Sequence, residues 1–262
     1  MEVIIRPDVD RAVDLVVKLI VALIKEKPNA TLGLATGRTM ERVYARLVAS
    51  GISFADCRTF NLDEYIGLPP DDPNSYRTYM NRHLFDHVDI DRANTHVLDG
   101  SALDLKKAAQ DYEAKIDDAG GIDLQLLGIG VAGHIGFNEP LSSFMSRTRD
   151  KSLTPTTRAQ NAEMFGGDSD KVPKRALTMG VGTILDAREL VLLATGCAKS
   201  SIVAKAVEGP ITSMVSASAI QMHPNCKVVL DEGSAKELQG RDYYDFVFAN
   251  EPKWESFRRV DN

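Results

Sequence analysis

The sequence has few cysteines, no long apolar run and no excess of basic residues. Its three cysteines, Cys57, Cys197 and Cys226, are widely spaced and form no CxxC pair, so we expect reduced structural thiols and a cytoplasmic protein. No apolar run reaches the length that spans a bilayer, and the first residues lack the basic start and small-residue cleavage site of a signal peptide. The formal net charge of −6 offers no basic surface to nucleic acid. A phosphorylated ligand must therefore be bound by a few local donors.

Short apolar runs alternate with longer amphipathic stretches along the 262 residues. The runs that we expect to be strands are Val3–Ile5, Thr31–Ala35, Arg58–Leu62, Thr95–Leu98, Leu124–Ile129, Leu190–Thr195 and Lys227–Leu230. The stretches that we expect to be helices include Val9–Lys25, Met40–Val48, Ser75–Leu84 and Leu103–Asp118. This alternation predicts an α/β fold with a mostly parallel sheet and helices on both faces. The length suits a single domain over residues 1–262.

Residues 141–173 break this alternation. The segment is polar, rich in Ser, Thr and Arg, and has no strong hydrophobic period. Long irregular segments in compact domains are usually lids, binding loops or disordered. A solvated loop is the simpler interpretation, but we favour a mobile lid because a glycine-rich segment with a histidine directly precedes it.

Polar residues follow four of the expected strands. The four clusters are Thr36–Thr39, Asn61–Glu64, Val131–His134 and Gly196–Lys199. In open parallel sheets, ligands bind outside the carboxyl ends of the strands. We therefore expect the four clusters to lie together.

Two of these clusters have the chemistry of a phosphate site. In Thr36, Gly37, Arg38 and Thr39, the glycine lets the backbone approach an anion, and the amides at a helix start donate to its oxygens together with the Thr39 hydroxyl. Lys199 adds a point charge at the start of a second helix pattern. The alternatives are a plain strand–helix turn capped by threonine and a solvated lysine.

The cluster around Asp63 has the chemistry of a general base. Asp63 and Glu64 are paired carboxylates at a strand end, and a base needs only to reach a carbon-bound proton with its pKa moved towards the working pH. Acidic residues are common in surface turns, which is the alternative. The flanking aromatic residues Phe60 and Tyr65 favour a base, because they offer walls that can remove water from a carboxylate.

The segment Gly128–Pro140 is the strongest candidate. Its glycines permit a tight backbone path after an apolar strand, and His134 and Glu139 lie close enough in sequence to meet in one loop. A carboxylate beside a histidine fixes its tautomer and supports the imidazolium form, which suits proton transfer near neutral pH. A lone histidine is more often structural, but the neighbouring glycines, asparagine and glutamate favour a functional one.

Together, these motifs give the chain a family resemblance. It resembles the glucosamine-6-phosphate deaminase (glucosamine-6-phosphate isomerase) family over nearly its whole length. The stretches that carry the resemblance are LGLATGRT, TFNLDEYIGLPPDDPNSY, LLGIGVAGHIGFNEP, SRTR, VPKRALTMGVGTILDA and QMHP. The resemblance implies a Rossmann-like sheet and conversion of glucosamine 6-phosphate and water to fructose 6-phosphate and ammonia, with no metal or organic cofactor.

The resemblance also implies roles for individual residues. Asp63 matches the base that moves a proton between C2 and C1, and His134 matches the acid/base that opens the pyranose ring. Glu139 matches the group that orients and charges this histidine. Thr36 to Thr39 and Lys199 match the phosphate site, and residues 141–173 match a mobile lid.

The chain departs from the family pattern at three places. Ala132 stands where Asp or Asn usually supplies a polar partner for the catalytic histidine. Glu163 stands where many members carry a lid arginine that reaches the phosphate. The phosphate turn reads Arg38-Thr39-Met40 where a small residue and then Thr-Pro are usual. Our hypothesis is that Arg38 supplies from the turn the charge that Glu163 no longer supplies, through the forked donors of its guanidinium.

Some members of the family are allosteric, with a site for N-acetylglucosamine 6-phosphate at subunit contacts. Ser142, Arg149 and Lys151 match part of that site, with Ser152 where Thr is usual. The resemblance therefore implies an activator and a homohexamer, although monomeric relatives exist.

Other functions compete with this interpretation. Ala132 and Glu163 also fit an enzyme that acts on another amino sugar phosphate or a ketoamine. A 6-phosphogluconolactonase shares the fold and a Gly-His loop but lacks the sequence motifs FNLDEY and HIGFNEP. A non-catalytic sugar-phosphate sensor would keep the site without turnover, and retention of Asp63, His134 and Glu139 argues against it.

Overall fold

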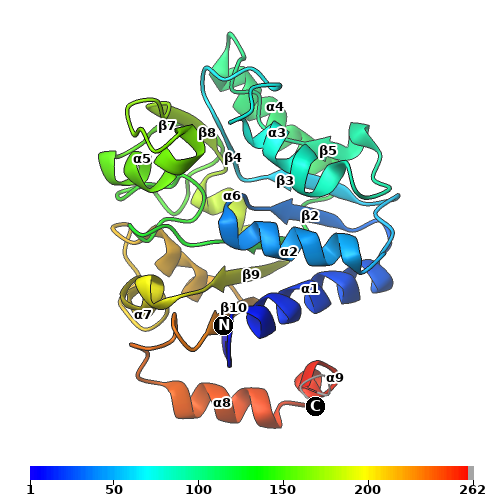
Figure 1. Ribbon diagram of the computed structural model, residues 1–262, viewed down its shortest axis with the longest axis vertical. Helices are drawn as coiled ribbons and strands as arrows, with labels where there is room; N and C mark the ends of the chain where they lie inside the picture. Colours follow the sequence, from blue (N-terminus) through cyan, green and yellow to red (C-terminus); the bar gives the residue numbers. More distant parts are fainter. Residues whose placement is uncertain (259–262) are drawn as a thin grey trace.

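A seven-stranded parallel sheet forms the centre of the protein in the computed structural model, which describes residues 1–258 (Figure 1). The strand order is β1 (Glu2–Arg6), β10 (Cys226–Asp231), β9 (Glu189–Ala194), β6 (Leu124–Leu127), β2 (Thr31–Leu34), β3 (Arg58–Asn61) and β5 (Thr95–His96). All six pairings between neighbours are parallel. The predicted mostly parallel sheet is therefore confirmed.

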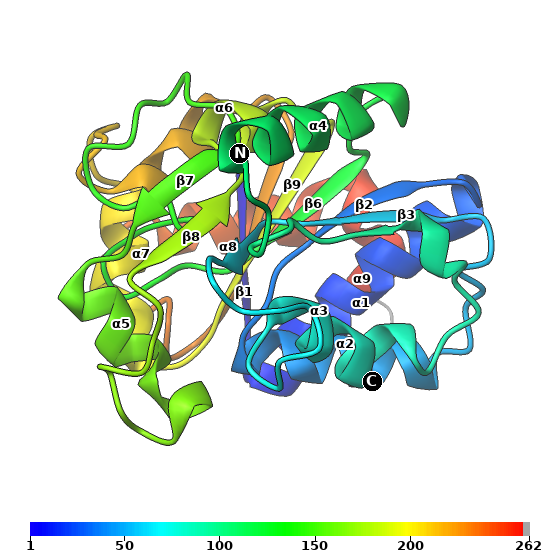
Figure 2. The same cartoon turned by 90° about the horizontal axis from the view of Figure 1, so that it is seen from above.

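Helices cover both faces of this sheet, as predicted. Helices α1 (Val9–Glu26) and α2 (Arg38–Ala49) pack on one face, and α4 (Leu105–Asp118) and α6 (Val181–Leu185) lie on the other (Figure 2). Strands β2 and β6 are buried along their full length, which is typical of strands covered on both sides. The other helices are α3 (Tyr76–Met80), α5 (Pro155–Asn161), α7 (Ser200–Val207), α8 (Arg241–Asn250) and α9 (Glu255–Arg258). No helix within residues 1–258 is both long and apolar enough to cross a membrane.

Helix α1 shows how the sequence produces one of these elements. It begins after Asp8, whose carboxylate accepts a hydrogen bond of 2.8 Å from the Arg11 backbone N–H. This N-cap satisfies one of the helix's free donors. Its apolar positions recur at the helical period, and Val13, Val16 and Ile20 are buried. Truncating one such side chain, as in Ile20→Ala, costs about 2–5 kcal/mol.

The strand order reverses between β2 and β6. From β2 the chain adds β3 and β5 on one side, and it then returns to place β6 on the other side of β2. A crevice forms at such a reversal, outside the carboxyl ends of the strands. Because β9, β6, β2 and β3 are neighbours, the four polar clusters that follow them meet at this crevice.

A second, antiparallel sheet stands beside the first and was not predicted. It consists of β4 (Asp63–Tyr65), β8 (Arg175–Thr178) and β7 (Arg149–Ser152), with Asp63 opposite Thr178. Sequence reasoning missed β7 because its four residues, RDKS, are polar and partly exposed, so they carry no apolar alternation.

The expectation of an irregular segment over residues 141–173 is therefore wrong in part. The segment contains β7, α5 and a 3-10 turn over Ala162–Phe165. Helix α5 starts after Thr154, which caps it, and has Pro155 in its first turn, a start signal that was present in the sequence. That the segment moves as a lid stays a prediction.

Candidate active site

A cavity of about 570 Å³ lies at the crevice between β2 and β6. Every predicted phosphate-binding residue lines it, and so do Asp63 and His134. Glu139 is buried behind His134 and does not line the cavity. Loops after four neighbouring strands thus bring together residues that are up to 163 positions apart, from Thr36 to Lys199. We call the part around Thr36–Thr39 and Lys199 the phosphate end, and the part around Asp63, His134 and Glu139 the proton-transfer end.

The phosphate end is built on the turn between β2 and α2. Gly37 has a φ of 121°, a conformation that favours glycine, and it precedes the first turn of α2. The first N–H groups of a helix have no partner within it, so they can donate to an anion. The Thr39 hydroxyl lies 3.4 Å from that of Thr195. Tyr79, which also lines the cavity, holds the turn by donating to the Gly37 carbonyl at 2.8 Å.

Lys199 brings a cation to this end from the loop after β9. Its Nζ donates to the carbonyl oxygen of Ile129 at 2.7 Å. Burial lowers the pKa of its ammonium group. The lysine therefore links the loops after β9 and β6 and leaves its remaining donors for a ligand.

Arg38 and Glu163 form an ion pair across the mouth of the cavity. Arg38 is the first residue of α2, and Glu163 belongs to the 3-10 turn after α5. Both side chains are largely exposed, at 75% and 65%. The structure thus places side by side two residues that depart from the family pattern.

Asp63 is the first residue of β4, where the chain leaves the large sheet for the small one. It is buried, and burial raises the pKa of its carboxyl group to about 8, with the charge of Glu64 adding to the effect and a backbone hydrogen bond from Phe137 opposing it. Glu64 accepts hydrogen bonds from the backbone N–H groups of Tyr65, Tyr76 and Arg77 at 2.8 to 3.0 Å. Burial raises the pKa of Glu64 to about 6. A carboxyl group that titrates near neutral pH, as Asp63 does, can both accept and return a proton.

Aromatic rings surround Asp63, but they are not the pair that we expected. Tyr76 and Phe137 line the cavity, and Tyr65 packs against both, with ring centroids 5.0 and 5.5 Å away. Phe60 instead stacks on His96 at 4.5 Å. The expectation that Phe60 forms a wall of the site is wrong, because Phe60 lies on β3 and packs against His96 and Tyr112, whereas Asp63 begins β4 in the other sheet.

His134 is held in a tight glycine loop. A Cβ on Gly130 would lie 2.1 Å from His134 Nε2, so only glycine fits there. His134 Nδ1 lies 3.7 Å from Glu139 Oε2, and neither atom has a hydrogen-bond partner among residues 1–258. Burial, followed by the charge of Lys199, lowers the pKa of His134, while Glu139 acts to raise it. The imidazole is thus placed to exchange a proton, with Glu139 to stabilise its charged form.

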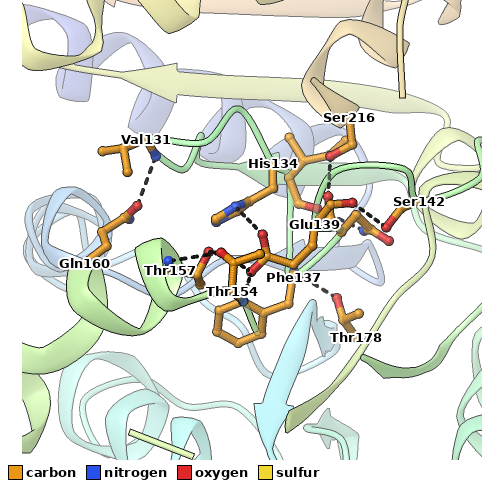
Figure 3. Close-up of polar contacts among 12 residues, drawn as sticks. Val131, His134, Phe137, Glu139, Ser142, Thr154, Thr157, Gln160, Thr178 and Ser216 are labelled. Atoms are coloured by element: carbon orange, nitrogen blue, oxygen red, sulfur yellow. Dashed lines mark hydrogen bonds and ion pairs between the residues drawn. The ribbon is translucent and has the colours of Figure 1, made fainter. Parts of the chain in front are cut away.

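Three contacts from outside position this loop (Figure 3). Glu139 Oε1 accepts from the backbone N–H of Thr154 at 2.9 Å and from its hydroxyl at 3.2 Å. The Val131 N–H donates to Gln160 Oε1 at 2.9 Å. The Phe137 N–H donates to the Thr178 hydroxyl at 3.0 Å. Two of these contacts come from residues 141–173, so that segment buttresses the Gly128–Pro140 loop in this structure.

Ser142, Arg149 and Lys151 lie outside the cavity. The Ser142 hydroxyl donates to the Glu139 carbonyl at 2.7 Å, and Arg149 donates to Asn138 Oδ1 at 2.9 Å. Lys151 follows Arg149 by two residues on β7, on the same half-buried side of the strand. The structure therefore brings Ser142 and Arg149 against the Gly128–Pro140 loop, on the side away from the cavity.

Sequence reasoning missed several residues of the site. Thr154 carried a readable signal, since Thr before Pro marks a helix start. Tyr76 and Tyr79 lie in or beside the stretch TFNLDEYIGLPPDDPNSY, but we assigned them no role. Thr195 ends an expected strand and Thr178 lies in the stretch VPKRALTMGVGTILDA, but we assigned neither of them a role. Gln160 had no local signal, because only the packing of distant segments brings it to the cavity. Within residues 1–258, no three side chains of His, Cys, Asp or Glu are grouped as ligands of one metal ion.

Comparisons with known proteins agree with these features. A sequence profile described as glucosamine-6-phosphate isomerases/6-phosphogluconolactonase matches residues 8–229, which includes the whole cavity. Glucosamine-6-phosphate deaminases of Streptomyces coelicolor and Mycolicibacterium smegmatis are 45% and 49% identical over 259 residues, covering 97% of this chain and 99% of each relative. A solved monomeric glucosamine-6-phosphate deaminase superposes with a TM-score of 0.87 at 42% identity, covering 90% of this chain and 99% of its own.

Proposed function

The chain belongs to the family of glucosamine-6-phosphate isomerases and 6-phosphogluconolactonases, and from this premise we propose that it is a glucosamine-6-phosphate deaminase. It converts glucosamine 6-phosphate and water to fructose 6-phosphate and ammonia. One observation carries the proposal beyond the similarity: Asp63 and His134 line one cavity with a turn suited to phosphate. A ring-opening acid/base and a carbon-proton base are the two groups that this reaction needs.

Phosphate binding and ring opening come first. The turn at Thr36–Thr39 and Lys199 hold the phosphate, which directs the sugar towards the proton-transfer end. His134 moves a proton from the C1 hydroxyl to the ring oxygen as the C1–O5 bond breaks, and an open-chain aldehyde results. Glu139 stabilises the imidazolium that forms during this transfer.

Asp63 then carries out the isomerisation. It takes the proton from C2, the electron pair of the C2–H bond forms a C1=C2 double bond, and the electrons of the C1=O bond move to O1, which takes a proton from water; an enol that bears the amino group results. Asp63 then returns its proton to C1, where the electron pair of the C1=C2 bond forms the new C–H bond, and the lone pair of the nitrogen forms a C=N bond to the electron-poor C2. Water adds to C2, ammonia leaves, and the ketone of fructose 6-phosphate remains. One carboxyl group serves both transfers because C1 and C2 are adjacent.

The test is ammonia release from glucosamine 6-phosphate, with fructose 6-phosphate measured in the same reaction. We expect equal amounts of the two products. No release by the intact protein would overturn the proposal in favour of a sensor or a changed substrate. Hydrolysis of 6-phosphogluconolactone, assayed in parallel, would instead support the lactonase branch of the family.

Arg38 is part of the phosphate site in this proposal. Its guanidinium lies at the mouth of the cavity beside Glu163, so the turn carries a cation where many relatives carry one in the lid. Loss of this charge in Arg38→Ala should raise the KM. An unchanged KM would contradict the compensation hypothesis.

A second candidate function is favoured by Glu163. A carboxylate at the mouth of the cavity suits a substrate that places its positively charged amino group at that position. Another amino sugar phosphate or a ketoamine would meet this condition. Turnover of such substrates at a higher kcat/KM than glucosamine 6-phosphate would establish this candidate.

Regulation and assembly complete the proposal. The activator N-acetylglucosamine 6-phosphate binds near Ser142, Arg149 and Lys151 in a homohexamer. The protein acts in the cytoplasm. Each chain is a single domain, and residues 141–173 close over its cavity as a lid. Support comes from the contacts of Ser142 and Arg149 with Glu139 and Asn138, through which a ligand would act on the catalytic loop. Sedimentation with and without the activator tests the assembly, and a monomer in both conditions would contradict it.

A further inference from the structure

The two oxygens of the Glu139 carboxylate face different partners. Oε2 faces His134 Nδ1 at 3.7 Å. Oε1 accepts two hydrogen bonds from Thr154, one from the backbone N–H and one from the hydroxyl. Glu139 is only 2% exposed, so protein groups alone determine the orientation of its carboxylate (Figure 3).

We infer that Thr154 is a positioning residue: through Glu139 it directs a carboxylate oxygen at His134, and it thereby couples the start of α5 to the ring-opening step. The inference rests on the proposed function. Thr154 does not line the cavity, so it acts through Glu139 and not on the substrate.

The geometry explains why this contact matters. The Glu139–His134 distance of 3.7 Å is too long for a hydrogen bond, so no direct bond holds the two side chains together. Thr154 supplies the donors that keep the carboxylate in its rotamer. If the hydroxyl is removed, Glu139 keeps one donor and can turn away from His134.

Thr154 also has a purely structural role, which an experiment must separate from positioning. Its hydroxyl accepts from the Thr157 N–H at 3.2 Å and caps α5. Loss of a cap destabilises a helix whatever lies beside it. A change in the titration of His134, in contrast, requires the contact with Glu139.

Among residues 1–258, two charged groups act on the pKa of His134. Glu139 on the same loop raises its pKa, and Lys199 after β9 lowers it. Asp63 on β4 lines the same cavity. Because no hydrogen bond or ion pair within residues 1–258 joins Thr154 to Lys199 or Asp63, a shift caused by Thr154 must pass through Glu139.

The experiment compares Thr154→Val with Thr154→Ser and with a matched control, Thr183→Val. Thr183 is a buried threonine of α6 whose hydroxyl donates to Glu113 at 2.6 Å, and neither residue lines the cavity. The control therefore removes the same kind of bond at another place. The readouts are the NMR titration of the His134 imidazole, kcat and KM for glucosamine 6-phosphate, and the melting temperature.

We expect Thr154→Val to lower the pKa of His134 and to reduce kcat about tenfold, by analogy with the lower limit for losing a residue that orients a metal-binding histidine, with KM within twofold. Thr154→Ser should keep wild-type values, and Thr183→Val should lower only the melting temperature. Should Thr154→Val fail to fold, Thr154→Gly removes the hydroxyl at little cost to the cap.

An unchanged His134 titration and an unchanged kcat in a folded Thr154 variant would overturn the inference. Thr154 would then have only the structural role of a helix cap. Failure of the proposed function has a different signature. In that case the wild type releases no ammonia, while the NMR titration still reports whether Thr154 controls His134.

Discussion

The two ends of the cavity hold charge in different ways. At the phosphate end, the ion pair of Arg38 and Glu163 is mostly exposed. Besides Arg38, the hydrogen-bond donors of this end are backbone N–H groups, hydroxyls and Lys199. At the proton-transfer end, Asp63 and Glu139 are 6% and 2% exposed, and His134 is as buried as Asp63. The phosphate end belongs to loops of the parallel sheet, whereas Asp63 begins a strand of the small antiparallel sheet.

This difference determines what each end can do. Water screens exposed charges, so each contributes little and several donors share the binding of an anion. Burial raises the pKa of Asp63 to about 8 and lowers that of His134, so burial shifts the protonation of single groups at this end. We therefore expect substitutions at the phosphate end to act on KM and those at the proton-transfer end to act on kcat.

The largest effect should come from Asp63→Asn, which keeps the shape of the side chain and removes the base. We expect kcat to fall about 10³-fold, within the range for a general base, with KM within threefold. Steady-state kinetics of ammonia release would measure both, with the exposed Asp111→Asn as control. A variant that retains a tenth of the activity would show that another group abstracts the proton.

The same substitution should change how stability depends on pH. Folded Asp63 has a pKa of about 8, and the unfolded chain has one of about 4. Between these values the folded protein binds the extra proton, so wild-type stability falls as pH rises, by up to about 1.4 kcal/mol per pH unit from this group. The Asp63→Asn variant has no carboxyl group at this position, so this part of the fall in stability with rising pH is absent. Denaturant unfolding from pH 5 to 8 should show the variant gaining stability relative to wild type, and parallel curves would contradict the raised pKa.

A smaller effect is expected from Arg38→Ala at the phosphate end. Removing one of several donors should raise KM about tenfold and leave kcat unchanged. A tenfold change corresponds to the loss of one charge-assisted hydrogen bond, which contributes about 1.5 kcal/mol to binding. Arg42→Ala, on the same helix but outside the cavity, is the matched control. A fall in kcat with an unchanged KM would contradict the expectation that the phosphate end acts on KM and the proton-transfer end on kcat.

The smallest effect should come from Glu163→Gln. The exposed ion pair with Arg38 is worth about 0.2–1 kcal/mol, and it competes with phosphate for the guanidinium. KM should therefore fall about two- to threefold, and the difference from wild type should shrink as salt is added. An increase in KM would mean that Glu163 itself binds the substrate.

Sequence reasoning reached the main groups of both ends of the cavity but not the residues that position them. Gly37 and Thr39 were readable because a strand, a glycine turn and a helix start follow one another locally. Asp63, His134 and Glu139 were also found, since strand ends and glycine loops mark them. The residues that position them were not: Thr178 and Gln160 reach the loop from β8 and α5, across contacts between distant parts of the chain.

By itself, the sequence determined the alternation of buried strands and amphipathic helices, and with it the parallel sheet and the four polar clusters at its carboxyl edge. These features depend on local hydrophobic period and turn residues. The tertiary structure alone decided that a polar segment, RDKS, pairs as β7, that Phe60 turns away from Asp63, and that Thr154 contacts Glu139. Each of these depends on pairing and burial between distant segments, and those same contacts set the pKa values at the proton-transfer end.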